Sequence, residues 1–172
     1  MPKAQDLIQL KAFARQDALL LAGLWMVSFA FIVMAPQSLL GGLLAFATPF
    51  VAGWLLRQFR DKVLDGFISF RRGFAYCFYC FIYASLLFAV AQYVYFRFIN
   101  GGQFIQMLTE SVKALEPVYQ ERGLNAAELQ QTLDAMKSLP PSQWVFMLLM
   151  QNIVIGIFLS IPIAVILRKV KK

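Results

Sequence analysis

The sequence predicts an all-α, polytopic membrane protein, with four transmembrane helices in an antiparallel bundle plus a short extracytoplasmic helical hairpin. Three stretches contain no charged residue, at 18–56, 73–96 and 138–167. Because a charged side chain at the centre of a bilayer helix costs about 2.5–3.5 kcal/mol on insertion scales, such stretches indicate contact with lipid. In addition, 60% of the 172 residues are hydrophobic and only 15% are charged, unlike the composition of a soluble domain.

The first charge-free stretch is long enough to cross the bilayer twice. Its 39 residues would form a helix of about 58 Å, whereas the hydrocarbon core is ~30 Å thick. Pro36 disfavours helical geometry at the residue before it, and Ser38 is placed to cap a new helix, so we predict a turn between them. The predicted crossings are therefore near 18–35, 39–56, 73–98 and 144–167, with Asp17 as a cap of the first.

The positions of the basic residues test the number of crossings independently. With four crossings, 12 of the 16 Lys and Arg residues lie at the end of the bundle that holds both termini. The positive-inside rule then places both termini and these twelve residues in the cytoplasm. The formal net charge of +7 is thus concentrated on one face, where it favours anionic lipids rather than nucleic acid as the partner.

The connections between the crossings also carry helical patterns. Residues 1–16 mix apolar and polar positions and are predicted to lie on the inner membrane surface. Residues 57–72 are predicted to form an interfacial helix that breaks at Gly66. Residues 103–138 are the outward helical segment, with two amphipathic helices of which Pro117 bends or ends the first.

Small residues and prolines mark the second and fourth crossings. Ala45, Pro49 and Gly53 recur every fourth residue, which predicts a seam for close packing between helices. Pro49 and Pro162 are predicted to kink their helices and to free backbone carbonyls.

The first candidate site is the basic connection between the second and third crossings. Its side chains would contact lipid headgroups or a membrane-protein partner on the cytoplasmic side, while their aliphatic stems lie along the membrane. An ordinary positive-inside loop is the alternative interpretation of the same composition. The candidate contacts are Arg57, Arg60, Lys62, Arg71 and Arg72.

The second candidate site is an intramembrane polar shelf in the outer half of the bundle. Its members lie seven or eight residues in from the outer ends of their helices, which places them about 10–12 Å deep. They would form a substrate site or, alternatively, only hydrogen-bond the helices to one another. The shelf consists of Gln92, Gln151 and Asn152, with Ser28 and Thr48 at a similar depth.

No constellation of residues in the sequence indicates an enzyme, a metal centre or a cofactor. The chain contains no histidine, so Cys77 and Cys80 lack the further ligands that a zinc site needs, and we interpret them as small packing residues. Asp61 and Asp65 are one turn apart near the membrane, but basic neighbours are available to pair with both. We therefore predict a non-enzymatic protein with no metal and no cofactor.

Three stretches of the chain resemble a known family. They are residues 17–31, 46–98 and 151–166, and the segment "DGFISFRRGFAY" at 65–76 is their most specific part. They resemble the small four-helix membrane proteins called domain of unknown function 4199. The resemblance implies a bacterial inner (cytoplasmic) membrane protein without an established activity, so no catalytic residue is carried over from it.

The expected function follows from these features. We predict a multi-pass inner-membrane accessory or scaffold subunit that binds anionic lipid, a membrane partner or a second copy of itself. The alternative function is a small transporter or lipid-handling protein that uses the polar shelf.

Overall fold

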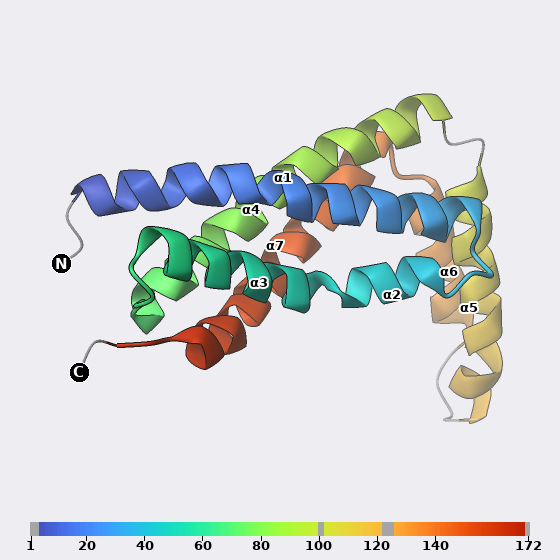
Figure 1. Cartoon of the computed structure of the whole chain (residues 1–172). Coiled ribbons are helices and arrows are strands. Elements are labelled where there is room, and N and C mark those ends of the chain that lie inside the picture. The colour runs from blue at the N-terminus through green and yellow to red at the C-terminus, as the bar shows by residue number, and fades with distance from the viewer. Residues whose placement is uncertain (1–3, 100–101, 122–125, 171–172) are drawn as a thin grey trace.

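The fold is a bundle of membrane-crossing helices with a helical hairpin across one end (Figure 1). The computed structural model describes residues 4–99, 102–121 and 126–170. Four of its helical segments are long and apolar enough to cross a membrane, so the predicted all-α four-helix membrane fold is confirmed. The crossings are α1 (Ala4–Met34), α2 (Leu40–Phe46) with α3 (Thr48–Val63), α4 (Phe70–Val94) with the π-helical turn η1 (Tyr95–Ile99), and α7 (Pro141–Leu167), and the hairpin is α5 (Gln103–Glu121) with α6 (Ala126–Lys137).

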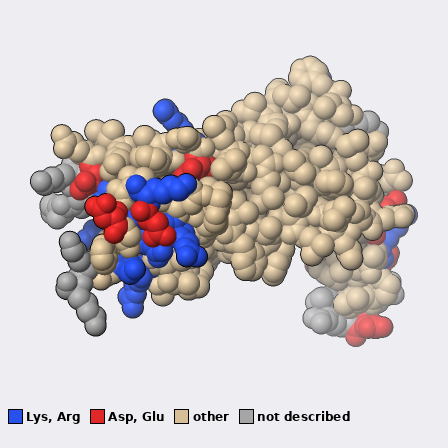
Figure 2. All heavy atoms as spheres, in the orientation of Figure 1, with Lys and Arg blue, Asp and Glu red and all other residues tan. Residues whose placement is uncertain are grey.

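The two ends of the bundle differ in what they hold. The start of α1, the turn between α3 and α4 and the end of α7 lie together, and the α5–α6 hairpin lies at the opposite end (Figure 1). We call the first the basic end, because it carries the cationic cluster around Arg57, Arg60 and Arg72, and the second the hairpin end. Figure 2 shows charged side chains gathered at these ends and a broad uncharged zone between them, as expected where lipid surrounds the helices.

The main hydrophobic core joins α1, α3, α4 and α7, and aromatic contacts connect the first three of these helices. The ring of Phe59 on α3 stacks on that of Tyr76 on α4, with centroids 4.5 Å apart. Trp25 on α1 contacts Phe81 and Phe88 on α4, at centroid distances of 6.0 and 5.8 Å. Such pairs add stability beyond the area that they bury, and they hold α1 and α3 against α4.

Small residues let α4 and α7 approach closely. A Cβ added to Gly156 would lie 2.6 Å from the Cβ of Phe81, and a Cβ on Gly73 would lie 3.5 Å from that of Ala164. Between these points on α7, buried Ser160 donates a hydrogen bond of 2.6 Å to the carbonyl of Gly156. Residues 156, 160 and 164 of α7 thus form a small-residue stripe of the kind found where transmembrane helices pack tightly.

The close packing predicted at Ala45, Pro49 and Gly53 is absent from the structure. Ala45 is exposed, Pro49 and Gly53 are half-buried, and all three line cavities rather than a tight helix contact. A Cβ added to Gly53 would lie 3.7 Å from Cδ1 of Leu167 and 3.9 Å from Cγ2 of Ile163, which is ordinary contact with α7 and not the close approach that the predicted seam requires. Small residues on α2 and α3 therefore leave grooves open.

The second crossing is interrupted between α2 and α3, at Ala47. Pro49 lies in the first turn of α3, where the missing N–H of proline removes no helical hydrogen bond. On α2, Gly41 approaches α1 so closely that an added Cβ would lie 2.6 Å from Cγ1 of Ile32. The turn before α2 lies where the sequence predicts it, and Ser38 accepts a hydrogen bond of 3.2 Å from the N–H of Leu40.

The first helix begins earlier than predicted. Residues 4–16 are not a separate segment on the membrane surface but continue into α1 as one helix of 31 residues. Leu10 and Ala14 in this part are buried in the core of the bundle. Asp17 consequently lies in the middle of α1 and is not a helix cap. The prediction of a surface segment failed because polar residues on one face of this helix made residues 4–16 resemble an amphipathic segment, although the other face is buried.

The basic connection is also shorter than predicted. Residues 57–63 continue α3, and α4 begins at Phe70, so a separate interfacial helix does not exist. The chain does break where predicted, because Asp65 and Gly66 have φ angles of 52° and 82°. Glycine adopts this left-handed conformation freely and aspartate tolerates it better than most residues do.

An aromatic cluster joins the hairpin to the bundle. Phe104 on α5 packs edge-on against Phe96 and Trp144, with centroids 4.9 and 5.3 Å apart. All three side chains are buried. Helix α5 does not end at Pro117 but continues to Glu121. Pro162 likewise lies inside α7, which continues to Leu167.

Candidate functional site

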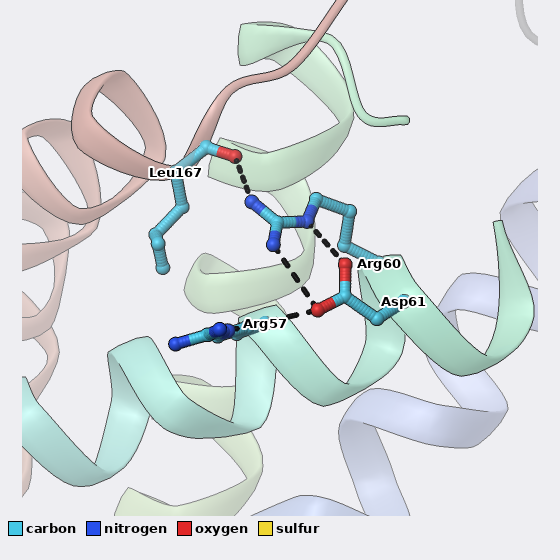
Figure 3. Close-up of polar contacts among 4 residues, drawn as sticks. All are labelled: Arg57, Arg60, Asp61 and Leu167. Atoms are coloured by element: carbon cyan, nitrogen blue, oxygen red, sulfur yellow. Dashed lines mark hydrogen bonds and ion pairs between the residues drawn. The ribbon is translucent and has the colours of Figure 1, made fainter. Parts of the chain in front are cut away.

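Of the five basic residues predicted to contact lipid or a partner, Arg60 is engaged inside the protein. Its side chain is only 14% exposed, and its Nε and Nη2 atoms lie 2.7 and 3.1 Å from the carboxylate oxygens of Asp61. Its Nη1 donates a hydrogen bond of 3.1 Å to the carbonyl of Leu167, the last residue of α7 (Figure 3). A cation is favourable there, because helix carbonyls at a C-terminus carry partial negative charge. Arg60 therefore ties α3 to the end of α7.

The residues that follow α7 are fixed to the turn between α3 and α4. Ile68 and Lys169 form an antiparallel bridge through two backbone hydrogen bonds of 2.8 and 2.9 Å. The ammonium of Lys169 also lies over the ring of Phe67, 5.7 Å from its centroid. The contact of Arg60 with Leu167 lies directly beside this bridge, so it holds the end of α7 in place.

We expect the variant Arg60→Gln to release the chain after α7. Loss of the bond to Leu167 should accelerate hydrogen exchange at the amides of Ile68 and Lys169, measured by mass spectrometry of peptides from both segments. Arg57→Gln is the matched control, because it removes one charge from the same helix without a bond to Leu167. Equal exchange in the two variants would contradict the role given to Arg60.

Arg72 is also engaged within the protein. Its Nη2 lies 3.5 Å from the amide oxygen of Gln9 and 3.8 Å from a carboxylate oxygen of Asp6, both on α1. Its side chain is 26% exposed, and its Nε is buried without a partner within the described part of the chain. Arg72 thus links the start of α4 to the start of α1.

The other three predicted basic residues face outward. The side chain of Arg57 is 68% exposed and lies 3.6 Å from Asp61 (Figure 3). Lys62 is exposed and donates a hydrogen bond of 2.6 Å to the side-chain oxygen of Gln58. Arg71 is exposed as well. These three side chains remain accessible to an anionic ligand.

An apolar groove of about 440 Å³ runs between α3 and α7 and reaches Arg57. Gly53 and Pro162 form part of its wall, and the exposed side chains of Trp54 and Ile166 border it. Arg57 is the one charged residue among the described residues that line it. The groove therefore combines a hydrocarbon surface with a cation at one end.

The predicted polar shelf lines a second cavity, of about 470 Å³, nearer the hairpin end. Gln92, Gln151 and Asn152 all contribute to its wall, so the structure brings the three together. Gln92 is only 2% exposed, whereas Gln151 is exposed and Asn152 is half-buried. The side-chain oxygen of Gln92 is buried without a hydrogen-bond partner among the residues that the structure describes.

Ser28 and Thr48, predicted at a similar depth, line the same cavity but are already satisfied. The hydroxyl of Ser28 donates a hydrogen bond of 2.8 Å to the carbonyl of Gly41. Thr48 accepts one of 3.0 Å from the indole N–H of Trp25. These two residues hold the α1–α2–α3 wall of the cavity together.

One polar pair between α1 and α4, half-buried at Asp17, was not predicted from the sequence. The hydroxyl of Tyr76, which is 1% exposed, donates a hydrogen bond to the carboxylate of Asp17. Asp17 was predicted to cap the first crossing, a role that implies no partner on another helix. The available signal was that both residues lie close to the predicted inner ends of their crossings, at residues 18 and 73.

The acidic residues and the cysteines considered as chemical groups lie in different surroundings. Asp61 is paired with Arg60 and Arg57, whereas Asp65 lies in the turn after α3. Cys77 and Cys80 are free and buried in the hydrophobic core. Across residues 4–99, 102–121 and 126–170, no three His, Cys, Asp or Glu side chains come together as a metal site would require.

The chain matches a known protein family. The family model described as "Protein of unknown function (DUF4199)" matches residues 16–169 of the chain. No curated protein and no solved structure matches it. The matched range includes α2 to α7 and most of α1, so it covers both cavities.

Proposed function

Because this chain belongs to the DUF4199 family, whose function is unknown, we propose a role from its geometry: a non-enzymatic, multi-pass membrane protein that binds an anionic phospholipid. The groove between α3 and α7 is the proposed binding site. One observation carries the proposal: the exposed side chain of Arg57 lies at one end of an apolar groove of about 440 Å³. The helices that form this groove are apolar enough to be surrounded by lipid.

The chemistry of the groove matches a phospholipid in two parts. An acyl chain fits the apolar surface between α3 and α7, where Gly53 leaves room. The phosphate pairs with Arg57, since guanidinium groups bind phosphate oxygens in a bidentate manner. Trp54 is exposed beside the groove, at the level where indole rings favour the membrane interface. Lys62 and Arg71 add positive charge nearby.

The orientation that we propose places the basic end in the cytoplasm of a bacterial inner membrane. The positive-inside rule supports this orientation. Anionic lipids are attracted to such a surface by about 1 kcal/mol for each Lys or Arg close to it. Arg60 and Arg72 are left out of the proposed contact set, because their side chains bond within the protein.

We expect Arg57→Gln to weaken phosphatidylglycerol binding about tenfold, because it removes a charge-assisted hydrogen bond to the phosphate in addition to one positive charge at the membrane surface. Native mass spectrometry of the protein titrated with phosphatidylglycerol, and separately with phosphatidylcholine, measures the change. Lys62→Gln is the control, since it removes the same charge at the same end but does not line the groove. Gly53→Leu should weaken binding with every charge retained, because its side chain fills the groove.

Two results would count against the proposal. Equal losses in Arg57→Gln and Lys62→Gln, with none in Gly53→Leu, would mean that only diffuse charge attracts the lipid. A dimer without retained lipid in the mass spectra would instead favour a scaffold that binds a second copy of the chain. Both outcomes are read from the same spectra.

A further inference from the structure

Gln92 on α4 lines the cavity at the hairpin end, and its side-chain oxygen is a buried hydrogen-bond acceptor. The residue is 2% exposed, it lines the cavity, and its Oε1 has no partner within residues 4–99, 102–121 and 126–170. Buried polar atoms in proteins are nearly always hydrogen-bonded, and one left unpaired is destabilising. If the Gln92 side chain rotates toward the cavity it lines, a group bound there can donate a hydrogen bond to Oε1 and remove this penalty.

The rest of the cavity restricts what that group can be. Among its described lining residues there is none with a charge, and Gln151 and Asn152 supply further uncharged polar groups. Its volume of about 470 Å³ falls in the range of small-molecule sites, roughly 300–1,000 Å³. A neutral ligand with few polar atoms suits this environment, since an ion would lose its hydration without gaining a counter-charge.

The cavity lies between the α1–α2 hairpin and the α4–α7 pair. Helix α2 packs along α1, and α7 packs along α4. Phe46 of α2 and Ile155 of α7 both line the cavity and are exposed. These exposed apolar side chains mark a side of the cavity that faces the hydrocarbon of the bilayer, so a ligand with a hydrocarbon part has access from the membrane.

We propose that this cavity binds a neutral amphiphile whose hydroxyl or amide group donates a hydrogen bond to Oε1 of Gln92. The hydrocarbon part of the ligand lies between α2 and α7, against Phe46 and Ile155. Gln151 and Asn152 contact the remaining polar atoms of its headgroup. This site differs from the phospholipid groove in position and in the absence of a cation, and it does not depend on that groove.

The fluorescence of Trp25 reports directly on the site, because its indole lines the cavity. The other two tryptophans are Trp54 and Trp144, which the variants Trp54→Phe and Trp144→Phe remove together. The probes are 11-bromoundecan-1-ol and its methyl ether, whose bromine quenches a nearby indole, added to the protein in phosphatidylcholine nanodiscs. The ether retains the chain but cannot donate a hydrogen bond.

We expect the quenching to saturate with both probes. The alcohol should reach half-maximal quenching at a concentration at least about fivefold lower than the ether, because the ether leaves the buried acceptor unpaired. Gln92→Leu should bring the two probes to the same affinity. Ser85→Ala is the matched control, because Ser85 is a buried residue of α4 whose hydroxyl is unpaired within the described chain but lies outside the cavity. That variant should keep the fivefold preference.

Other outcomes overturn the proposal. Quenching that rises without saturation means that the probes only dissolve in the bilayer. Saturable quenching with no preference for the alcohol means that water already satisfies Gln92. If the variant with one tryptophan does not fold, the same probe pair is compared by thermal unfolding of the wild-type protein and of Gln92→Leu, and a shift specific to the alcohol must disappear in the variant.

Discussion

Replacing Gly156 with alanine is expected to lower the free energy of unfolding by about 1–3 kcal/mol, the usual effect of overpacking a close contact. The new Cβ would lie 2.6 Å from Cβ and 2.7 Å from Cγ of Phe81. Phe81 is buried between α1 and α7 and stacks on Trp25, so its ring has no free space to enter. Helices α4 and α7 would have to separate, which weakens their whole interface.

Unfolding in mixed micelles with increasing dodecyl sulfate measures this change as a shift in midpoint. Gly23→Ala is the control, because a Cβ at Gly23 on α1 meets nothing within 4 Å. That variant should be unchanged or up to about 1 kcal/mol more stable, since alanine favours helix over glycine. Equal midpoints for the two variants would mean that the α4–α7 contact is looser than the structure shows.

The crossings and the depth of the polar shelf could be predicted because they depend on distance along a helix. Each residue adds about 1.5 Å, so counting from the ends of the crossings placed Gln92, Gln151 and Asn152 at one level. The structure brings these three residues to one cavity. Their meeting also required the right rotation of α4 and α7, which depth alone does not determine.

Contacts that depend on helix rotation and on neighbours distant in sequence could not be predicted. Arg60 and Arg57 look equivalent in the sequence, yet Arg60 reaches the carbonyl of Leu167, 107 residues later, while Arg57 faces the groove. The close packing predicted at Ala45, Pro49 and Gly53 failed for the same reason, because their spacing does not determine what the partner helix places in front of them. Whether a small residue forms a contact or a groove is decided by the partner helix, here by the side chains of α7.

Tyr76→Phe is expected to lower the free energy of unfolding by about 1–3 kcal/mol, because it removes the hydroxyl that donates to the carboxylate of Asp17. The ring of Tyr76 would still stack on Phe59, so the loss reports on the hydrogen bond rather than on packing. Tyr83→Phe removes a hydroxyl from a half-buried tyrosine on the same helix, and it should change stability by less than about 0.5 kcal/mol.

A double-mutant cycle with Asp17→Ala separates the pair from its surroundings. Removing both groups should be less destabilising than the sum of the single changes, because each single variant leaves a polar group inside the bundle without its partner. Asp17→Asn tests the role of charge, since the amide oxygen still accepts from Tyr76. If the single effects simply add, Asp17 and Tyr76 act independently, and the link between α1 and α4 rests on aromatic packing alone.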